Sequence, residues 1–344
     1  MRKLLNTLFV TNPDVYIGAK GDNIVIREND DLKARFPLLN LENIVIFNYN
    51  GVSPSLMQKC LERGIGIHFL SATGFYLGSV HGYPNGNVLL RKQQVLNSAQ
   101  EEFCLKFARV TIFAKIFNQK NIISRYLRQY SLRIDTERFS NVCDKLSLFA
   151  KQVATETESL DEVRGLEGFA QVLYFSLWDE LVLTNKDVFK YEGRNRRPPR
   201  DPLNACLSFA YSLLSTDVKN ALTTVGLDPY IGFFHTDRPG RVSLALDMME
   251  ELRGVMVDRF VLSLINRGQI NSKDFEYMES GAVLLSDNSR GDFLREWHKY
   301  KQQEITHPFL KEKIQWGLVP YSQALLLARF IRGDIDEYPV FCWK

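Results

Sequence analysis

The chain has 344 residues, of which 45% are hydrophobic and 24% charged, and its formal net charge is +3. This balance is that of a folded globular protein and argues against a disordered or fibrous one. The small excess of positive charge does not by itself indicate a nucleic-acid partner, so only local clusters of arginine could do so.

Cysteine usage and the distribution of apolar residues predict the compartment. The five cysteines are scattered and form no CxxC pair, which favours free thiols in a reducing environment and argues against a zinc site. The start of the chain lacks the small-residue cleavage site of a signal peptide, and no apolar run approaches the roughly 20 residues of a membrane-spanning helix. We therefore expect a cytoplasmic protein with no membrane partner.

Residues 1–87 are expected to form a small, mainly β domain. Short β-branched or alternating runs predict strands at residues 23–27, 43–47, 66–70 and 74–80, separated by turns at residues 21–22, 48–51 and 84–87. One helix is expected from about Ser53 to Arg63, with Ser53 as N-cap and Pro54 in the first turn.

Residues 88–344 are expected to form a larger, all-α catalytic domain, because apolar residues recur there at helical spacing. A long helix is predicted through Val95 to Ile116. Further helices are predicted at residues 134–152, 158–182, 202–223, 244–267, 273–285, 289–315 and 321–332. The fold class is thus α+β with two domains, as the chain length also suggests.

Two isolated residues, Glu167 and His235, are candidates for a catalytic or metal-binding role. Glu167 lies inside an apolar helical run, although most helix glutamates are solvated and few are buried without a partner or a metal. His235 ends an apolar segment and begins a loop rich in Pro and Gly. Its imidazole is a good ligand for a transition-type cation, but a lone histidine of this kind is more often structural.

An acidic helical turn is the third candidate. Asp247, Glu250 and Glu251 are three and four residues apart, so we expect them on one helical face, where like charges repel. Arg253 or solvent is the simplest source of neutralisation. A divalent cation is the alternative, since carboxylates with one imidazole suit Mg²⁺ or, better, Mn²⁺.

A loop containing two prolines concentrates positive charge. Arginine side chains pair with phosphate oxygens, so this loop could hold a DNA backbone without reading its sequence, although a solvated loop is an equal alternative. The DNA-contact candidates are Arg194, Arg196, Arg197 and Arg200 in this loop, with Arg238 and Arg241 farther along the chain.

These motifs occur in an order that resembles a known family, the CRISPR-associated spacer-acquisition endonuclease/integrase, which is the larger of the two universal adaptation proteins. The resemblance covers essentially the whole chain, and the Arg/Pro motif with the Tyr338-Pro-Val-Phe ending looks most like the type I-C subgroup. The motifs that carry it are Arg164-Gly-Leu-Glu167-Gly, Arg196-Arg197-Pro-Pro-Arg-Asp201-Pro-Leu-Asn204-Ala, Ile231-Gly-Phe-Phe-His235, Gly240-Arg-Val-Ser243-Leu and Asp247-Met-Met-Glu250.

The resemblance implies a catalytic set and a metal. A divalent cation, Mg²⁺ or Mn²⁺, would be held by Glu167, His235 and Glu250, and Asp247 matches a second acidic position. Many relatives carry aspartate at the last ligand position, so the choice between Glu250 and Asp247 stays open. The implied metal chemistry is stabilisation of the charge that builds up on a phosphate under in-line attack.

The resemblance also implies substrates and partners. Attack by water would cleave DNA, whereas attack by a DNA 3′-hydroxyl would join a double-stranded prespacer to the leader–repeat end of a CRISPR array by two transesterifications. The family acts as an asymmetric homodimer, and two such dimers flank a dimer of a small adaptation partner protein. The alternatives are a non-catalytic DNA-binding architectural subunit and a metal-dependent nuclease for branched repair intermediates.

Overall fold

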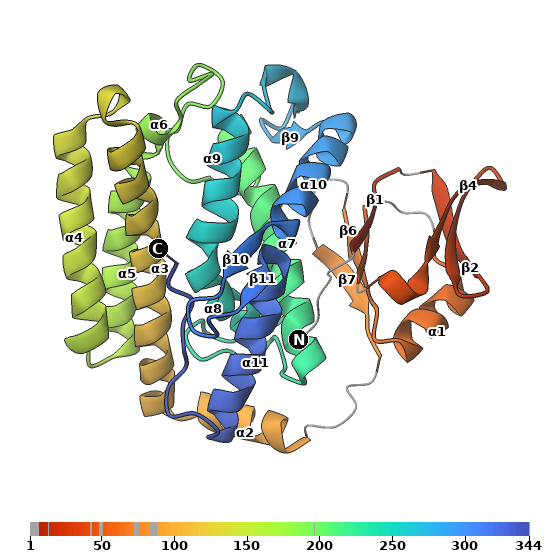
Figure 1. The fold of residues 1–344 in the computed structure, drawn as a ribbon, viewed down its shortest axis with the longest axis horizontal. Coiled ribbons are helices and arrows are strands. Elements are labelled where there is room, and N and C mark those ends of the chain that lie inside the picture. Colours follow the sequence, from red (N-terminus) through yellow and green to blue (C-terminus); the bar gives the residue numbers. More distant parts are fainter. Residues whose placement is uncertain are drawn as a thin grey trace.

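The computed structural model describes residues 7–12, 14–41, 43–47, 51–71, 76–82, 88–195 and 197–343. In these ranges a β-rich N-terminal region is followed by a helical region, as the sequence predicts (Figure 1). The predicted turn at residues 84–87, most of the turn at 48–51 and Arg196 lie outside the described residues.

The N-terminal region contains two sheets and one helix. A four-stranded sheet has the order β1 (Thr7–Val10), β5 (Asn43–Ile46), β6 (Gly66–Leu70) and β7 (Tyr76–Val80), in which only the β6–β7 pair is antiparallel. A three-stranded antiparallel sheet is formed by β2 (Val15–Lys20), β3 (Asn23–Glu28) and β4 (Asp31–Pro37). Helix α1 (Pro54–Glu62) is capped by the Ser53 side chain, as predicted.

Three of these strands were not predicted, and their sequences explain why. Strand β4 is exposed along most of its length and carries charged residues, so it has no alternating apolar pattern. Strand β2 contains Gly18 and Ala19, which lower its β propensity. Strand β1 has the sequence Thr-Leu-Phe-Val, a short apolar run whose periodicity does not distinguish a strand from a helix.

The four-stranded sheet is covered on both faces. One face contributes Ile44, Ile46 and Ile67 to a core shared with β2, β3 and α1. The other face contributes Val45 to the main hydrophobic core, where the nearby Phe47 ring lies 5.9 Å from Phe209 of helix α7 (Pro202–Val225). All four residues of β5 are therefore buried, a pattern typical of parallel strands covered on both sides.

The helical region follows the predicted order closely. The expected long helix at residues 95–116 is two helices, because the helix is interrupted by a turn at residues 99–100. Asp201 caps α7 and Gly226, at φ 87°, ends it. The helices are α2 (Val88–Ser98), α3 (Glu101–Gln129), α4 (Thr136–Thr155), α5 (Leu160–Phe175), α6 (Trp178–Leu181), α7 (Pro202–Val225), α8 (Ser243–Leu252), α9 (Arg259–Asn266), α10 (Asp287–Gln302) and α11 (Val319–Arg332).

The prediction of an all-α second region is wrong in two places. Residues 273–285, expected to be helical, form the hairpin of β8 (Phe275–Tyr277) and β9 (Val283–Leu285), which turns at Gly281 with φ 78°. The helix expected at residues 289–315 ends at Gln302, and β10 (Glu304–Thr306) pairs with β11 (Lys313–Gln315). Each hairpin depends on pairing between strands that a helical-periodicity test does not detect.

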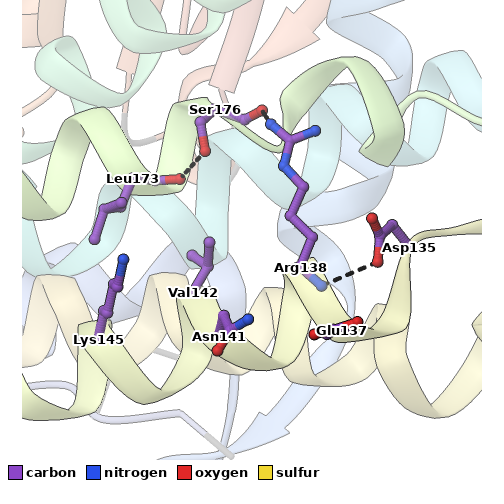
Figure 2. Close-up of a pocket in the computed structure, with 8 residues that line it drawn as sticks. All are labelled: Asp135, Glu137, Arg138, Asn141, Val142, Lys145, Leu173 and Ser176. Carbon is purple, nitrogen blue, oxygen red and sulfur yellow. Dashed lines mark hydrogen bonds between the residues drawn. The ribbon is translucent and has the colours of Figure 1, made fainter.

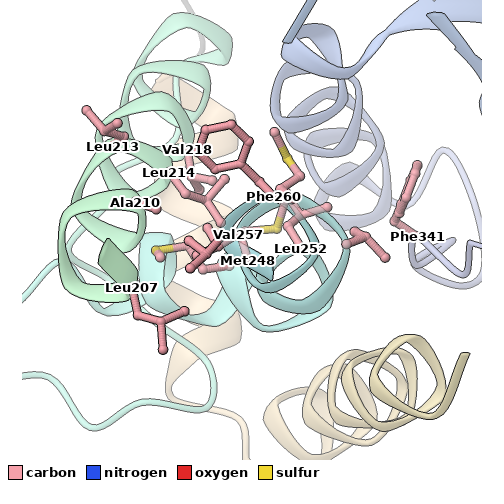
Figure 3. Packing of buried hydrophobic residues seen from close by; sticks show 14 of the residues in the cluster. Leu207, Ala210, Leu213, Leu214, Val218, Met248, Leu252, Val257, Phe260 and Phe341 are labelled. Carbon is pink, nitrogen blue, oxygen red and sulfur yellow. The ribbon is translucent and has the colours of Figure 1, made fainter. Parts of the chain in front are cut away.

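Helix α8 lies in the interior of the helical region, packed against α3 and α7 (Figures 1 and 3). Met248 and Leu252 of α8 belong to the same hydrophobic core as Leu207 and Leu214 of α7, as Figure 3 shows. A π-helical segment, residues 253–258, joins α8 to α9. This central position buries the acidic turn that the sequence singled out.

None of the described helices is long and apolar enough to cross a membrane. The domain boundary after residue 87 stays a prediction, since residues 83–87 are outside the described ranges.

Candidate active site

The four predicted catalytic residues come together from three segments of the chain. Helix α8 carries Asp247 and Glu250 one turn apart, α5 carries Glu167, and the loop before α8 carries His235. His235 Nε2 lies 3.8 Å from Glu250 Oε1. Glu167 and Glu250 are linked through Lys115 of α3, whose ammonium pairs with Glu167 Oε1 and lies 2.7 Å from Glu250 Oε2.

Asp247 fixes the position of His235. It is fully buried, and its Oδ1 accepts hydrogen bonds from His235 Nδ1 at 2.6 Å and from the His235 backbone N–H at 2.8 Å. Its Oδ2 accepts from the backbone N–H groups of Phe233 and Phe234 at 2.7 and 3.0 Å. Because Asp247 engages Nδ1, Nε2 is the ring nitrogen of His235 that faces Glu250.

The loop reaches Asp247 only because residue 232 is glycine. A Cβ atom at Gly232 would lie 2.7 Å from Ser243 Cβ, which is closer than real Cβ contacts, and 3.0 Å from Asp247 Oδ2, which is tighter than most of them. Arg164 of α5 fastens the same loop, since its Nη2 donates to the Phe234 carbonyl at 2.8 Å. The glycine and the arginine of the sequence motifs therefore have structural roles beside the candidate site.

Glu250 is a buried, ionised carboxylate. Burial by itself would raise its pKa, but Arg253, Lys115 and His235 outweigh burial and hold the pKa at about 2. Arg253 Nε lies 3.1 Å from Oε1, on the other oxygen from Lys115. The Lys115 contact has the distance of an ion pair, yet Oε2 has no hydrogen-bond partner of acceptable geometry among the described residues. The Glu250 carboxylate thus has a cationic group beside each of its oxygens.

Lys115 was not singled out in the sequence. Its side chain is only 5% exposed. Burial lowers the pKa of Lys115, but the negative charges of Glu250 and Glu167 raise it by more than burial lowers it. The net shift of the pKa is upward, so the amine stays protonated. A signal was present, because Lys115 shares the buried face of α3 with Ala108, Thr111 and Ile122 at helical spacing. A lysine at a core position calls for an acidic partner.

Glu251 belongs to a different environment, so the expectation that all three acidic residues share one face is wrong. Its carboxyl group accepts from Tyr338 Oη and the Phe341 backbone N–H, each at 2.5 Å, and from Gln323 Nε2 at 3.0 Å. One residue of helix rotation, about 100°, turns it away from Glu250. Burial raises the pKa of Glu251 to about 7, against the lowering effect of its three donors.

The described arginines of the Arg/Pro loop differ in exposure. Arg194 is half-buried, donates to Asn204 Oδ1 at 2.7 Å and lies over the Tyr211 ring. Arg197 and Arg200 are exposed. The loop that carries them is held by a hydrogen bond in which Asn195 Oδ1 accepts from the Arg200 backbone N–H at 2.7 Å. In the loop before α8, Arg238 is exposed and Arg241 is half-buried.

One described pocket lies away from these residues. It has a volume of about 370 Å³ and is lined by α4, the turn before it, and the end of α5, with charged residues such as Arg138 and Lys145 on its wall (Figure 2). Arg138 Nη2 donates to the Ser176 carbonyl across it at 2.7 Å. None of the four candidate catalytic residues lines this pocket, so the acidic cluster is not part of it.

Comparisons with known proteins identify the family of the chain. The family model described as CRISPR associated protein Cas1 matches residues 8–299. The chain is 42% identical over 344 residues to CRISPR-associated endonuclease Cas1 1 of Chlorobaculum tepidum, and the match covers 100% of both chains.

Two solved structures share the fold. One is a casposase bound to its integration product, with a TM-score of 0.82, 21% identity and coverage of 97% of this chain and 92% of that chain. The other is a chain of a Cas6-RT-Cas1–Cas2 complex, with a TM-score of 0.81, 23% identity and coverage of 99% of this chain and 36% of that chain. From the family model and the full-length relative, we conclude that the chain belongs to the Cas1 family of CRISPR-associated proteins.

Proposed function

We propose that the protein is a metal-dependent DNA endonuclease and integrase that inserts foreign DNA fragments into a CRISPR array. The observation that carries this proposal is the meeting of Glu167, His235 and Glu250 from three segments, with Asp247 holding the imidazole. Membership of a family whose curated relatives are named endonucleases supports the same activity.

The donor set fits a divalent cation, Mg²⁺ or Mn²⁺. We propose Glu167, His235 Nε2 and Glu250 as its ligands, since two carboxylates and an imidazole suit such ions. Glu250 is preferred to Asp247, because both oxygens of Asp247 are already engaged by four N–H donors. In the described residues no three acidic, His or Cys groups stand close enough to hold an ion, and Lys115 separates Glu167 from Glu250.

Each residue then has a defined task. Glu167 and Glu250 supply negative charge, and Asp247 fixes the tautomer and direction of His235. A bound cation would polarise a non-bridging phosphate oxygen and stabilise the charge of in-line attack. With water as nucleophile the DNA is cut. With a prespacer 3′-hydroxyl, one phosphodiester bond forms as another in the leader–repeat breaks, and the displaced oxygen leaves as a 3′-hydroxyl.

DNA would lie along the arginine-bearing loops. Arg197, Arg200 and Arg238 are exposed and suited to phosphate contact, while the half-buried Arg194 and Arg241 support the same loops. Arg196, outside the described residues, stays in the predicted set.

We further propose an assembly of this chain as a homodimer with the small CRISPR adaptation protein. The likeness of this chain to part of a solved Cas6-RT-Cas1–Cas2 complex supports a partner of that kind. The type I-C subgroup, the cytoplasmic location and the division into residues 1–87 and 88–344 are kept as predictions from the sequence.

The deciding experiment measures Mn²⁺-dependent cleavage of branched DNA and strand transfer into a leader–repeat plasmid. Glu167→Gln, His235→Ala and Glu250→Gln should each lower both rates by at least about 100-fold, because each removes a proposed ligand. Glu180→Gln is the control, since Glu180 of α6 pairs with Arg138 instead.

The same assay separates the alternatives. Wild-type rates in Glu167→Gln and His235→Ala would reject the metal-site assignment. DNA binding without turnover would identify an architectural subunit, and strong preference for a splayed fork over the leader–repeat duplex would identify a repair nuclease.

A further inference from the structure

We propose that Lys115 is the resident counter-cation of the active site: its ammonium holds Glu167 and Glu250 together in the metal-free protein and leaves this acidic pair when a divalent cation binds. The inference rests on the proposed metal site and adds a residue that competes with the metal.

The contacts of Lys115 place its charge between two proposed ligands. Its Nζ pairs with Glu167 Oε1 and lies 2.7 Å from Glu250 Oε2. The Lys115 and Glu250 side chains are each 5% exposed, while Glu167 is 26% exposed and forms the open side of the cluster. The ammonium therefore stands where a cation shared by the two carboxylates would stand.

Arg253 cannot replace Lys115 as the cation between Glu167 and Glu250. It approaches Glu250 at Oε1, the oxygen that faces away from Lys115, and its guanidinium lies over the Tyr211 ring at 5.1 Å. Without Lys115, the half-buried Glu167 and the buried Glu250 would face each other with no cation between them, and like charges repel there more than in open solvent. Lys115 thus keeps both ligands within reach of one another before metal arrives.

The same geometry makes Lys115 a competitor of the metal ion for the carboxylate oxygens of Glu167 and Glu250. One carboxylate oxygen cannot make a close contact with both an ammonium and a metal ion at the same place, so metal binding and the Lys115 ion pairs are negatively coupled. Lysine suits the exchange of an ammonium for a metal ion, because its compact charge is carried by a flexible four-carbon chain. An arginine would instead form planar, bidentate hydrogen bonds with the carboxylates.

The first test is the Mn²⁺ dissociation constant of the full chain, measured by calorimetry. Lys115→Met removes the competing charge but keeps an unbranched side chain, and we expect it to lower the dissociation constant roughly tenfold or more, within the usual range of coupling. The matched control is Lys301→Met, because Lys301 is also buried and pairs with Asp217, outside the active site. It should leave the dissociation constant unchanged.

An unchanged or raised dissociation constant in Lys115→Met would overturn the proposal, as would an equal decrease in Lys301→Met. Failure of the proposed function looks different, because wild type and Lys115→Met would then both bind no Mn²⁺, or His235→Ala would bind it as well as wild type.

A second test needs no variant, so it decides the question even if Lys115→Met does not fold. Acylation of lysines by a small amine-reactive reagent is followed by mass spectrometry on the wild-type chain. Lys115 should react slowly without metal and several-fold faster with saturating Mn²⁺, while Lys301 should not change. Equal labelling of Lys115 with and without bound Mn²⁺ would show that the ammonium does not leave the acidic pair.

Discussion

At the scale of single residues, environment assigns different tasks to acidic side chains of one helix. Asp247 uses both oxygens on N–H donors of the His235 loop, Glu250 faces cationic groups, and Glu251 faces the C-terminal segment. Their sequence spacing does not distinguish them. What separates them is which neighbour each meets in the interior, as is usual for carboxylates whose pKa values diverge.

Glu251 gives a prediction about pH. Its pKa in the folded protein is about 7 and its ordinary value is 4.5, so the folded state binds the proton more tightly. The resulting stability is complete below pH 4.5 and is lost as pH rises toward 7, by about 3 kcal/mol for a shift of this size.

Urea unfolding at several pH values between 4.5 and 7.5 checks this. Glu251→Gln has no titrating group at this position, so its free energy of unfolding should fall less over that window than that of wild type. The comparison is between slopes, because the amide also changes the hydrogen bonds with Tyr338 and Phe341 at every pH. Identical slopes would contradict the assignment to Glu251.

At the scale of elements, the site depends on a loop packed tightly against a buried helix. The three backbone N–H groups of residues 233–235 point at Asp247, and Gly232 allows the approach. The acidic turn is then placed by the packing of α8 against α3 and α7. Loop and helix therefore together support His235.

Gly232→Ala tests this support. The added Cβ would lie 2.7 Å from Ser243 Cβ, so the loop must move and the hydrogen bonds to Asp247 weaken. We expect a decrease of about 2 kcal/mol or more in unfolding free energy, from overpacking and weakened hydrogen bonds, together with weaker Mn²⁺ binding.

Gly165→Ala is the matched control, since nothing lies within 4 Å of the Cβ that it adds on α5. Alanine in a helix interior should stabilise the protein by roughly 0.5–1 kcal/mol. Thermal unfolding of both variants, with and without Mn²⁺, gives the comparison. A Gly232→Ala protein as stable as wild type would show that the loop adapts at little cost.

At the scale of the whole molecule, the N-terminal sheet and the helical region are packed together. Asn220 of α7 donates to Asn43 of β5 at 2.5 Å, beside the contact of Phe47 with Phe209. The central sheet thus contributes to two cores, one on each face. The exposed arginines lie on loops outside these cores and are free to meet a long, charged partner.

The dependence of DNA affinity on salt tests this surface. The double variant Arg197→Ala, Arg200→Ala should reduce the slope of log affinity against log salt on duplex DNA, by about 0.9 for each phosphate that the protein then leaves unneutralised. Arg332→Ala is the control, because Arg332 pairs with Asp334 at the end of α11. An unchanged slope in the double variant would indicate a solvated loop that does not touch the DNA backbone.

Much of the fold was predictable because the signals are local. The Ser53 and Asp201 caps, the alternation in β3 and the helical spacing in α4 and α7 each depend on residues a few positions apart. The β8–β9 and β10–β11 hairpins were missed because short strands are stabilised by partners that periodicity does not reveal.

The sequence by itself determined the order of β-rich and helical regions, and its motifs identified Glu167, His235, Asp247 and Glu250 as candidates. Only the tertiary structure decided their tasks. It placed Asp247 behind His235, turned Glu251 away, and inserted Lys115 between Glu167 and Glu250. The physical reason is that the electrostatic partner of a buried charge is set by packing between segments distant in sequence, which no local pattern encodes.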